Sequence, residues 1–149
     1  MALSKYESDI QIVHNNQDII YNYLSDFSNL AQYVNDGLLA QINEAAPQIT
    51  VSDFEYDSDS CRFNISGMGQ AEIRIINREP SKTIKVSSSG SLPVGITFWI
   101  QLLPVTPYET KMKLTLHAEM GMMIKMMVGK KLKKGINDLA EMIAKIPFH

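Results

Sequence analysis

Three histidines and one cysteine are the residues of this chain best suited to metal binding or nucleophilic catalysis. His14 ends a predicted strand, His117 has the outward parity of another, and His149 is the last residue. No HxxxH or HExxH spacing occurs, and Cys61 alone cannot form a thiolate cluster. The sequence also has neither a GxSxG motif nor a GxxxxGKS/T loop. It therefore predicts no metal site, no nucleotide loop and no cofactor.

General acid–base catalysis would require a carboxylate or a histidine held in a cavity with a shifted pKa. Glu72 has the outward parity of its strand, and the pattern does not fix the facing of Asp53 or Glu55. Asn77 and Ser88 have inward parity near strand ends, where they are suited to orient a polar group of a ligand. These residues do not form one constellation, so the catalytic residues are unknown.

The clearest structural pattern is an apolar stripe at spacings of three and four in the C-terminal segment. It predicts an amphipathic helix from Met122 to Ile146. The stripe consists of Ile124, Val128, Leu132, Ile136, Leu139 and Ile143. Before Gly129, methionines replace it and point around the helix axis: Met120, Met122, Met123, Met126 and Met127. Because methionine fills irregular space, we expect this half of the helix to contact apolar groups on more than one side.

The elements before this helix read mainly as strands. A first half-buried strand has the inward residues Tyr6, Ser8, Ile10 and Ile12. Two short helices follow, with apolar faces formed by Ile20, Tyr23, Leu24 and Phe27 and then by Leu30, Tyr33, Val34 and Leu38. From Ile49 to Glu119 the period is two and the turns are short, which predicts an antiparallel meander of about six strands. A sheet of six or seven strands that curls around one long helix is an α+β fold of two layers.

Composition is typical of a soluble protein with one domain, covering residues 1–149. The chain is 45% hydrophobic and 20% charged, with a formal net charge of −2. Basic and acidic residues are mixed, so nucleic-acid binding is not expected. No apolar run approaches the roughly 20 residues that span a bilayer, so no stable membrane insertion is expected. MALSKYESD lacks the apolar core of a signal peptide, which predicts a cytoplasmic location. The oligomeric state is unknown.

Nearly the whole chain resembles the START-like or Bet v 1-like superfamily, also called SRPBCC, which includes polyketide cyclases and lipid-transfer domains. The resemblance rests on the order of the elements and on three segments: YESDIQIVHNNQDIIYNYLSDFSNL, GMGQAEIRI and MVGKKLKKGINDLAEMIAKIP. These segments look like those of small bacterial members of unassigned function. The resemblance implies a helix-grip fold with a deep apolar cavity between the sheet and the C-terminal helix.

Candidate cavity residues follow from this expectation together with the strand parity. On the strands they are Phe63, Ile65, Ile73, Phe98, Ile100, Met112 and Leu114, and on the long helix they are Met123 and Met127. Tyr33 and Leu38, on the second short helical segment, are candidates for the cavity mouth. The alternative for each residue is ordinary core packing, and for the methionines also a partner or membrane contact.

Two functions fit these residues. The first is a binding module that sequesters or carries an apolar small molecule, such as a lipid, an aromatic or a polyketide-like compound. The second is an enzyme of the cyclase or aromatase type acting in the same cavity. An enzyme needs an ionisable group inside the cavity, and the inward parity offers almost none, so binding is favoured. A third alternative is a structural or dimerising domain whose interior is filled by methionine.

A short basic run lies on the polar side of the predicted helix. It consists of Lys130, Lys131, Lys133 and Lys134. A solvated helix face explains the run, and contact with phosphate or anionic lipid is the alternative.

Overall fold

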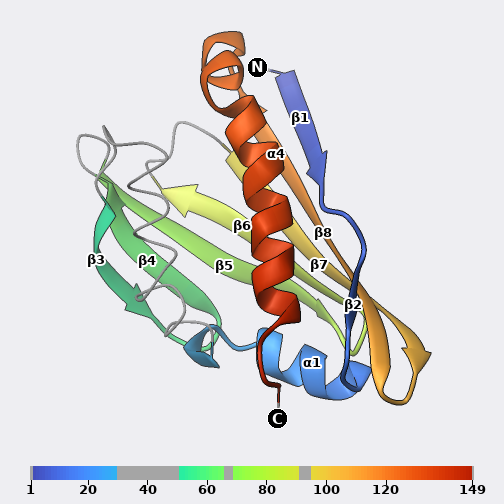
Figure 1. Ribbon diagram of the computed structural model, residues 1–149. Coiled ribbons are helices and arrows are strands. Elements are labelled where there is room, and N and C mark those ends of the chain that lie inside the picture. The colour runs from blue at the N-terminus through green and yellow to red at the C-terminus, as the bar shows by residue number, and fades with distance from the viewer. Residues whose placement is uncertain (1, 30–50, 66–68, 91–94, 149) are drawn as a thin grey trace.

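The computed structural model describes residues 2–29, 51–65, 69–90 and 95–148, and Figure 1 shows its elements. The elements, labelled as in that figure, are β1 (Ala2–Glu7), β2 (Gln11–Val13), α1 (Gln17–Leu24), β3 (Val51–Tyr56), β4 (Ser60–Ile65), β5 (Gly69–Glu79), β6 (Thr83–Gly90), β7 (Gly95–Thr106), β8 (Glu109–Met120) and α4 (Met122–Ala144). Residues 27–29 are helical, and the rest of the second predicted short helix lies outside the described residues.

The eight strands form one antiparallel sheet in the order β1-β8-β7-β6-β5-β4-β3, with β2 also paired to β8. Consecutive strands from β3 to β8 are neighbours, so the predicted meander is confirmed. The strand count exceeds the predicted six or seven because the first predicted strand is divided into β1 and β2. The chain is therefore α+β, as the alternation predicted.

The break between β1 and β2 reverses the expected facing of the second part. Tyr6 is half-buried and Ser8 is buried, as predicted. Ile10 and Ile12, however, are 60% and 42% exposed, whereas Val13 is only 2% exposed. The expectation that Ile10 and Ile12 face inward is thus wrong, because a one-residue slip turns every later side chain to the other face.

Ser8 stabilises this break through its side chain. The Leu114 N–H donates to Ser8 Oγ at 2.9 Å, and the Ser8 N–H donates to the Leu114 carbonyl at 2.9 Å. The Ser8 hydroxyl in turn donates to the Asp9 carbonyl at 3.0 Å. A buried hydroxyl thus keeps the β8 backbone hydrogen-bonded where the register of the neighbouring strand changes.

A second irregularity in β5 moves Asn77 outward. The register between β5 and β6 shifts between Ile75 and Asn77, so Asn77 is exposed and the prediction of its inward facing is wrong. Arg78 then lies opposite the buried Ile84. Its guanidinium donates to the Ser25 carbonyl at the C-terminus of α1, at 3.0 and 3.2 Å. A cation at this helix end also interacts favourably with the helix dipole.

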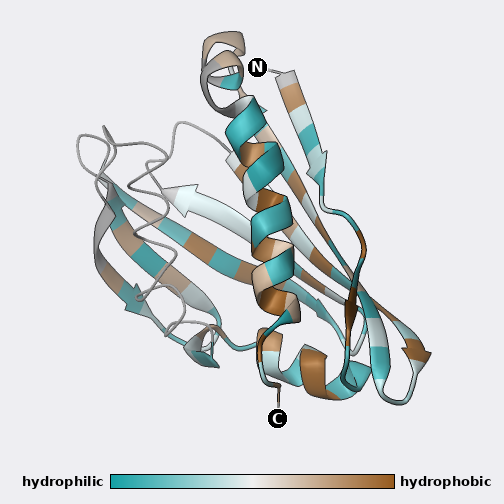
Figure 2. Ribbon diagram, viewed as in Figure 1, coloured by the Kyte–Doolittle hydropathy of each residue, from teal (hydrophilic) through white to brown (hydrophobic). Residues whose placement is uncertain are grey.

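Helix α4 runs along the inner side of the sheet and packs against β8, β1 and β2 (Figure 1). It ends two residues before the predicted boundary, with Lys145 as the C-cap. Its buried residues include Ile136, Ala140 and Ile143, while Leu132 and Leu139 are half-buried. Figure 2 shows hydrophilic and hydrophobic residues interleaved along α4, as expected for a helix with one solvent-facing side. Within the described residues, no helix is long and apolar enough to cross a membrane.

The two glycines inside α4 differ in their surroundings. Their alanine variants are therefore expected to differ in the free energy of unfolding. A Cβ at Gly135 would meet no atom within 4 Å, so Gly135→Ala is expected to raise the free energy of unfolding by about 0.5–1 kcal/mol. A Cβ at Gly129 would lie 3.3 Å from the Tyr6 hydroxyl oxygen, so Gly129→Ala should gain less or lose stability. Urea unfolding of both variants checks this, and equal gains would show that Tyr6 does not restrict the helix.

Candidate ligand-binding site

The inner face of the sheet carries apolar rows that run across the strands, since paired residues of an antiparallel sheet share a face. In a row toward the α1 end of the sheet, Ile84, Ile100 and Leu114 pair across β6, β7 and β8. They are only 1%, 4% and 0% exposed. Helix α1 packs against β6 and β7 at this end. The first row is therefore closed core.

In the next rows several large apolar side chains are less completely buried, while Ile75, Val86, Cys61, Ala71 and Ala118 stay buried. The second row consists of Ile75, Val86, Phe98, Leu116 and Tyr6. In this row Phe98, Leu116 and Tyr6 are only half-buried. The third row contains Cys61, Ile73 and Ser88, and Phe63 lies in the row beyond it, opposite Ala71. Ile73 and Phe63 are also half-buried.

The positions of the helices account for this gradient. Because α4 packs against β8, β1 and β2, it covers part of the inner face on that side of the sheet. Large apolar side chains remain only partly covered on β4, β5 and β7, and also at Leu116 on β8 and Tyr6 on β1. We call Phe63, Ile73, Phe98, Leu116 and Tyr6 the concave cluster. Apolar side chains left half-buried on an inward face offer surface to an apolar ligand.

The sequence-predicted cavity residues divide into four groups. Phe63, Ile73 and Phe98 belong to the concave cluster. Ile100, Met112 and Leu114 are closed core, with at most 4% of their surfaces exposed. The side chains of Ile65 and Met127, and the whole of Tyr33 and Leu38, lie outside the described residues. Met123 lies at the surface instead, because it belongs to the first turn of α4, which projects at the end of the sheet (Figure 1).

Leu116 and Tyr6 belong to the concave cluster but were not among the predicted cavity residues. Both have the inward parity of their strands, so the alternation in the sequence could have identified them. Tyr6 is distinctive because its hydroxyl lies beneath α4, close to Gly129. It brings a hydroxyl group to an otherwise apolar surface.

Polar groups on the inner face are few and mostly engaged. Ser88 Oγ accepts a hydrogen bond from the Ile96 N–H at 2.9 Å. Burial raises the pKa of the Cys61 thiol to about 11, against a smaller opposing effect of the Arg62 charge, so this thiol stays protonated at neutral pH. Ser4 Oγ, beside the cluster on β1, is buried and has no hydrogen-bond partner. Apolar contact and shape thus dominate what this surface can offer a ligand.

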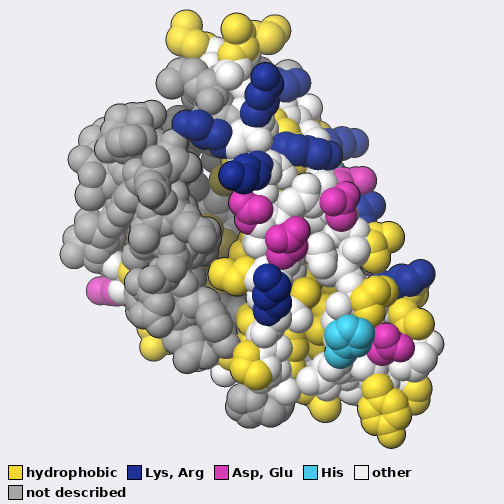
Figure 3. All heavy atoms as spheres, viewed as in Figure 1, with side chains coloured by type: hydrophobic (Ala, Val, Ile, Leu, Met, Phe, Trp, Pro, Cys, Tyr) yellow, Lys and Arg dark blue, Asp and Glu magenta, His cyan; other side chains and the backbone are white. Residues whose placement is uncertain are grey.

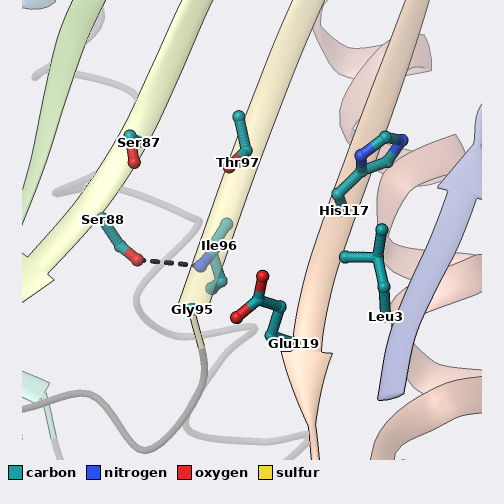
Figure 4. A pocket seen from close by; sticks show the side chains of 8 residues that line it. All are labelled: Leu3, Ser87, Ser88, Gly95, Ile96, Thr97, His117 and Glu119. Atoms are coloured by element: carbon teal, nitrogen blue, oxygen red, sulfur yellow. Dashed lines mark hydrogen bonds between the residues drawn. The ribbon is translucent and has the colours of Figure 1, made fainter. Parts of the chain in front are cut away.

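A hollow away from the concave cluster lies at the far ends of β6, β7 and β8 and holds about 340 Å³. Figure 4 shows its lining residues: Leu3, Ser87, Ser88, Gly95, Ile96, Thr97, His117 and Glu119. The His117 ring packs edge-on against Trp99, with ring centroids 4.5 Å apart. His117 faces outward as its parity predicted. Among the described residues, no group of three or more His, Cys, Asp or Glu side chains is placed to hold a metal ion.

Neither a protein-family model nor a curated protein matches this chain in sequence. Solved structures do match. A conserved protein of Geobacillus kaustophilus superposes with a TM-score of 0.63 at 17% identity, over 95% of this chain and 93% of that chain. Truncated norcoclaurine synthase of Thalictrum flavum gives 0.61 at 14% identity, over 97% and 92%. A Thermus thermophilus protein gives 0.60 at 11% identity, over 95% of each.

These likenesses extend over nearly the full length of each chain. Identities this low establish the fold and leave the activity to be argued from the site. The chain has the Bet v 1-like, SRPBCC-type helix-grip fold that its sequence resembled.

Proposed function

We propose that this protein binds an apolar small molecule against the concave cluster, and thereby sequesters or carries it. The observation behind the proposal is the gradient of burial along the inner face. Ile100 and Leu114 are closed, while Phe98 and Leu116, one row away on the same strands, are half-buried. Large apolar side chains with this parity and incomplete cover are suited to complete their packing against a ligand.

The expected affinity follows from the area that a ligand would bury. Removing apolar surface from water contributes about 25 cal/mol per Å², so a ligand that buries about 300 Å² gains roughly 7 kcal/mol before ordering costs. This is compatible with dissociation constants in the micromolar range. A lipid, an aromatic or a polyketide-like compound fits such a surface, and the Tyr6 hydroxyl is placed to meet a polar group of the ligand.

Binding is favoured over cyclase or aromatase chemistry by the state of the groups that could move protons. The Cys61 thiol is protonated at neutral pH, since its pKa is raised to about 11. This thiol is therefore not set up as a general base beside the cluster.

The test is uptake of the neutral fluorescent probe N-phenyl-1-naphthylamine. We expect the protein to bind it saturably, with a dissociation constant in the micromolar range. Ile73→Trp adds bulk within the concave cluster and is expected to weaken binding by about tenfold or more. Its thermal midpoint should stay within a few degrees of the original value if the added ring occupies space that a ligand would use.

Leu103→Trp is the matched control, because Leu103 lies on β7 with 61% of its surface exposed. It should bind the probe as the unmodified protein does. The proposal fails if the unmodified protein takes up no probe, or if both tryptophan variants bind it equally well.

A further inference from the structure

The first two turns of α4 expose three large apolar side chains. Met122, Met123 and Met126 are 75%, 77% and 82% exposed. Figure 3 shows hydrophobic side chains gathered at this end of the molecule, beyond the polar surface of the helix. Methionine side chains this exposed contribute little to the fold, and their grouping at one projecting tip marks a contact surface. We call these three residues the methionine tip.

A belt of positive charge adjoins the methionine tip. Between residues 120 and 137 the chain has five lysines and no aspartate or glutamate. The lysines are Lys125, Lys130, Lys131, Lys133 and Lys134, all exposed, and Figure 3 shows basic side chains next to the tip. Among the residues that the structure describes, Lys125, Lys130, Lys133 and Lys134 form no ion pair.

The start of the helix adds to this positive field. The N-cap is Gly121, which provides no side-chain cap, and the first turn contains no acidic residue. The unpaired N–H groups of a helix N-terminus carry the positive end of the helix dipole. The nearest acidic residues along the chain are Glu119 before the tip and Asp138 after it.

We propose that the methionine tip and its lysine belt dock this protein reversibly on an anionic lipid bilayer. The methionines would enter the boundary between headgroups and acyl chains, and the lysines would meet the lipid phosphates and carboxylates. At about 1.5 Å per residue, Lys130 lies roughly 6 Å along the axis from Met126, within the depth of the headgroup layer. Burial of apolar side chains at the headgroup boundary and attraction of lysines to anionic lipids are the two contributions that hold proteins on membrane surfaces.

The charge favours a membrane over a second copy of this chain as the occupant. Two tips meeting face to face would bring their lysines and their positive helix ends together. An anionic surface neutralises both. No residue of the methionine tip or the lysine belt belongs to the concave cluster, so the vesicle test does not depend on the ligand proposed above.

Flotation with vesicles tests the proposal. Binding is expected to phosphatidylcholine vesicles in which about a third of the lipid is phosphatidylserine, and not to pure phosphatidylcholine. Raising the salt concentration should release the protein. Each lysine near the surface contributes a factor of about five, so Lys130→Gln with Lys133→Gln should weaken binding roughly 25-fold. Met123→Gln with Met126→Gln should weaken it by about tenfold or more.

The matched control variants replace other exposed apolar side chains and other exposed lysines by glutamine. Leu103→Gln with Tyr108→Gln removes apolar side chains at the opposite end of the molecule, and Lys82→Gln with Lys111→Gln removes two distant charges. Both control variants should bind vesicles as the unmodified protein does, with all variants keeping the original thermal midpoint. The proposal is overturned if the protein ignores anionic vesicles, or if the methionine variant abolishes a dimer in sedimentation while vesicle binding is absent.

Discussion

Replacing Leu114 with alanine is expected to lower the free energy of unfolding by about 2–5 kcal/mol. Leu114 lies in the middle of the closed row, with 0% of its surface exposed, between Ile100 on β7 and Ser8 beside β1. Removing its branched end leaves a cavity that the sheet cannot close, because the backbone on both sides is fixed by hydrogen bonds. Urea or thermal unfolding measures the loss.

Leu103→Ala is the control for this change. The same atoms are removed from an adjacent strand, but Leu103 is 61% exposed. Its loss should stay within about 0.5 kcal/mol. If the two variants lose similar amounts of stability, the inner and outer faces of the sheet have been assigned incorrectly.

The second large effect is a loss of stability at alkaline pH that depends on Cys61. Burial raises the pKa of this thiol from 9.0 to about 11 in the folded chain, and the nearby Arg62 charge opposes the rise. Between these values the unfolded chain releases the thiol proton while the folded chain keeps it. The contribution is therefore complete below about pH 9 and is lost as the pH rises through about 11. Its size is on the order of 2 kcal/mol.

Comparison with Cys61→Ala isolates this contribution, because other groups that titrate at alkaline pH are common to both proteins. Denaturant unfolding at about pH 8 and about pH 10.5 under reducing conditions gives the two stability differences. The unmodified protein should lose more stability between these pH values than the alanine variant. Parallel pH profiles would mean that the Cys61 thiol is already accessible to water in the folded chain.

The architecture followed from the sequence because each element has one face in the core and one in solvent. That asymmetry gives the strands their alternation, and the predicted end of the meander at Glu119 differs by one residue from the observed end of β8 at Met120. The same asymmetry gives α4 its stripe, and the predicted end at Ile146 differs by two residues from the observed end at Ala144. Short turns between consecutive strands then leave an antiparallel meander as the simplest arrangement.

The side of the sheet that a residue faces could be predicted only where the strand has no register shift. Ile10, Ile12 and Asn77 all follow a register shift, and each one faces the opposite way from its parity. A shift depends on which hydrogen bonds two strands exchange, such as that from the Leu114 N–H to Ser8 Oγ. The partners lie more than 100 positions apart for β1 and β2 and on the next strand for β5, and the alternation within one strand does not contain that information.

The sequence by itself determined the layers, the long helix and the inward side of most strands, because these depend on local periodicity. It could not determine which inward-facing side chains are fully buried and which are only half-buried. Ile100 and Phe98 have the same parity on β7, yet one is closed and the other is half-buried. Likewise, Met120 is buried while Met123, three residues later, is exposed. Only the tertiary structure decided these differences, because cover depends on where α1 and α4 lie over the sheet and on where the sheet ends beneath the helix.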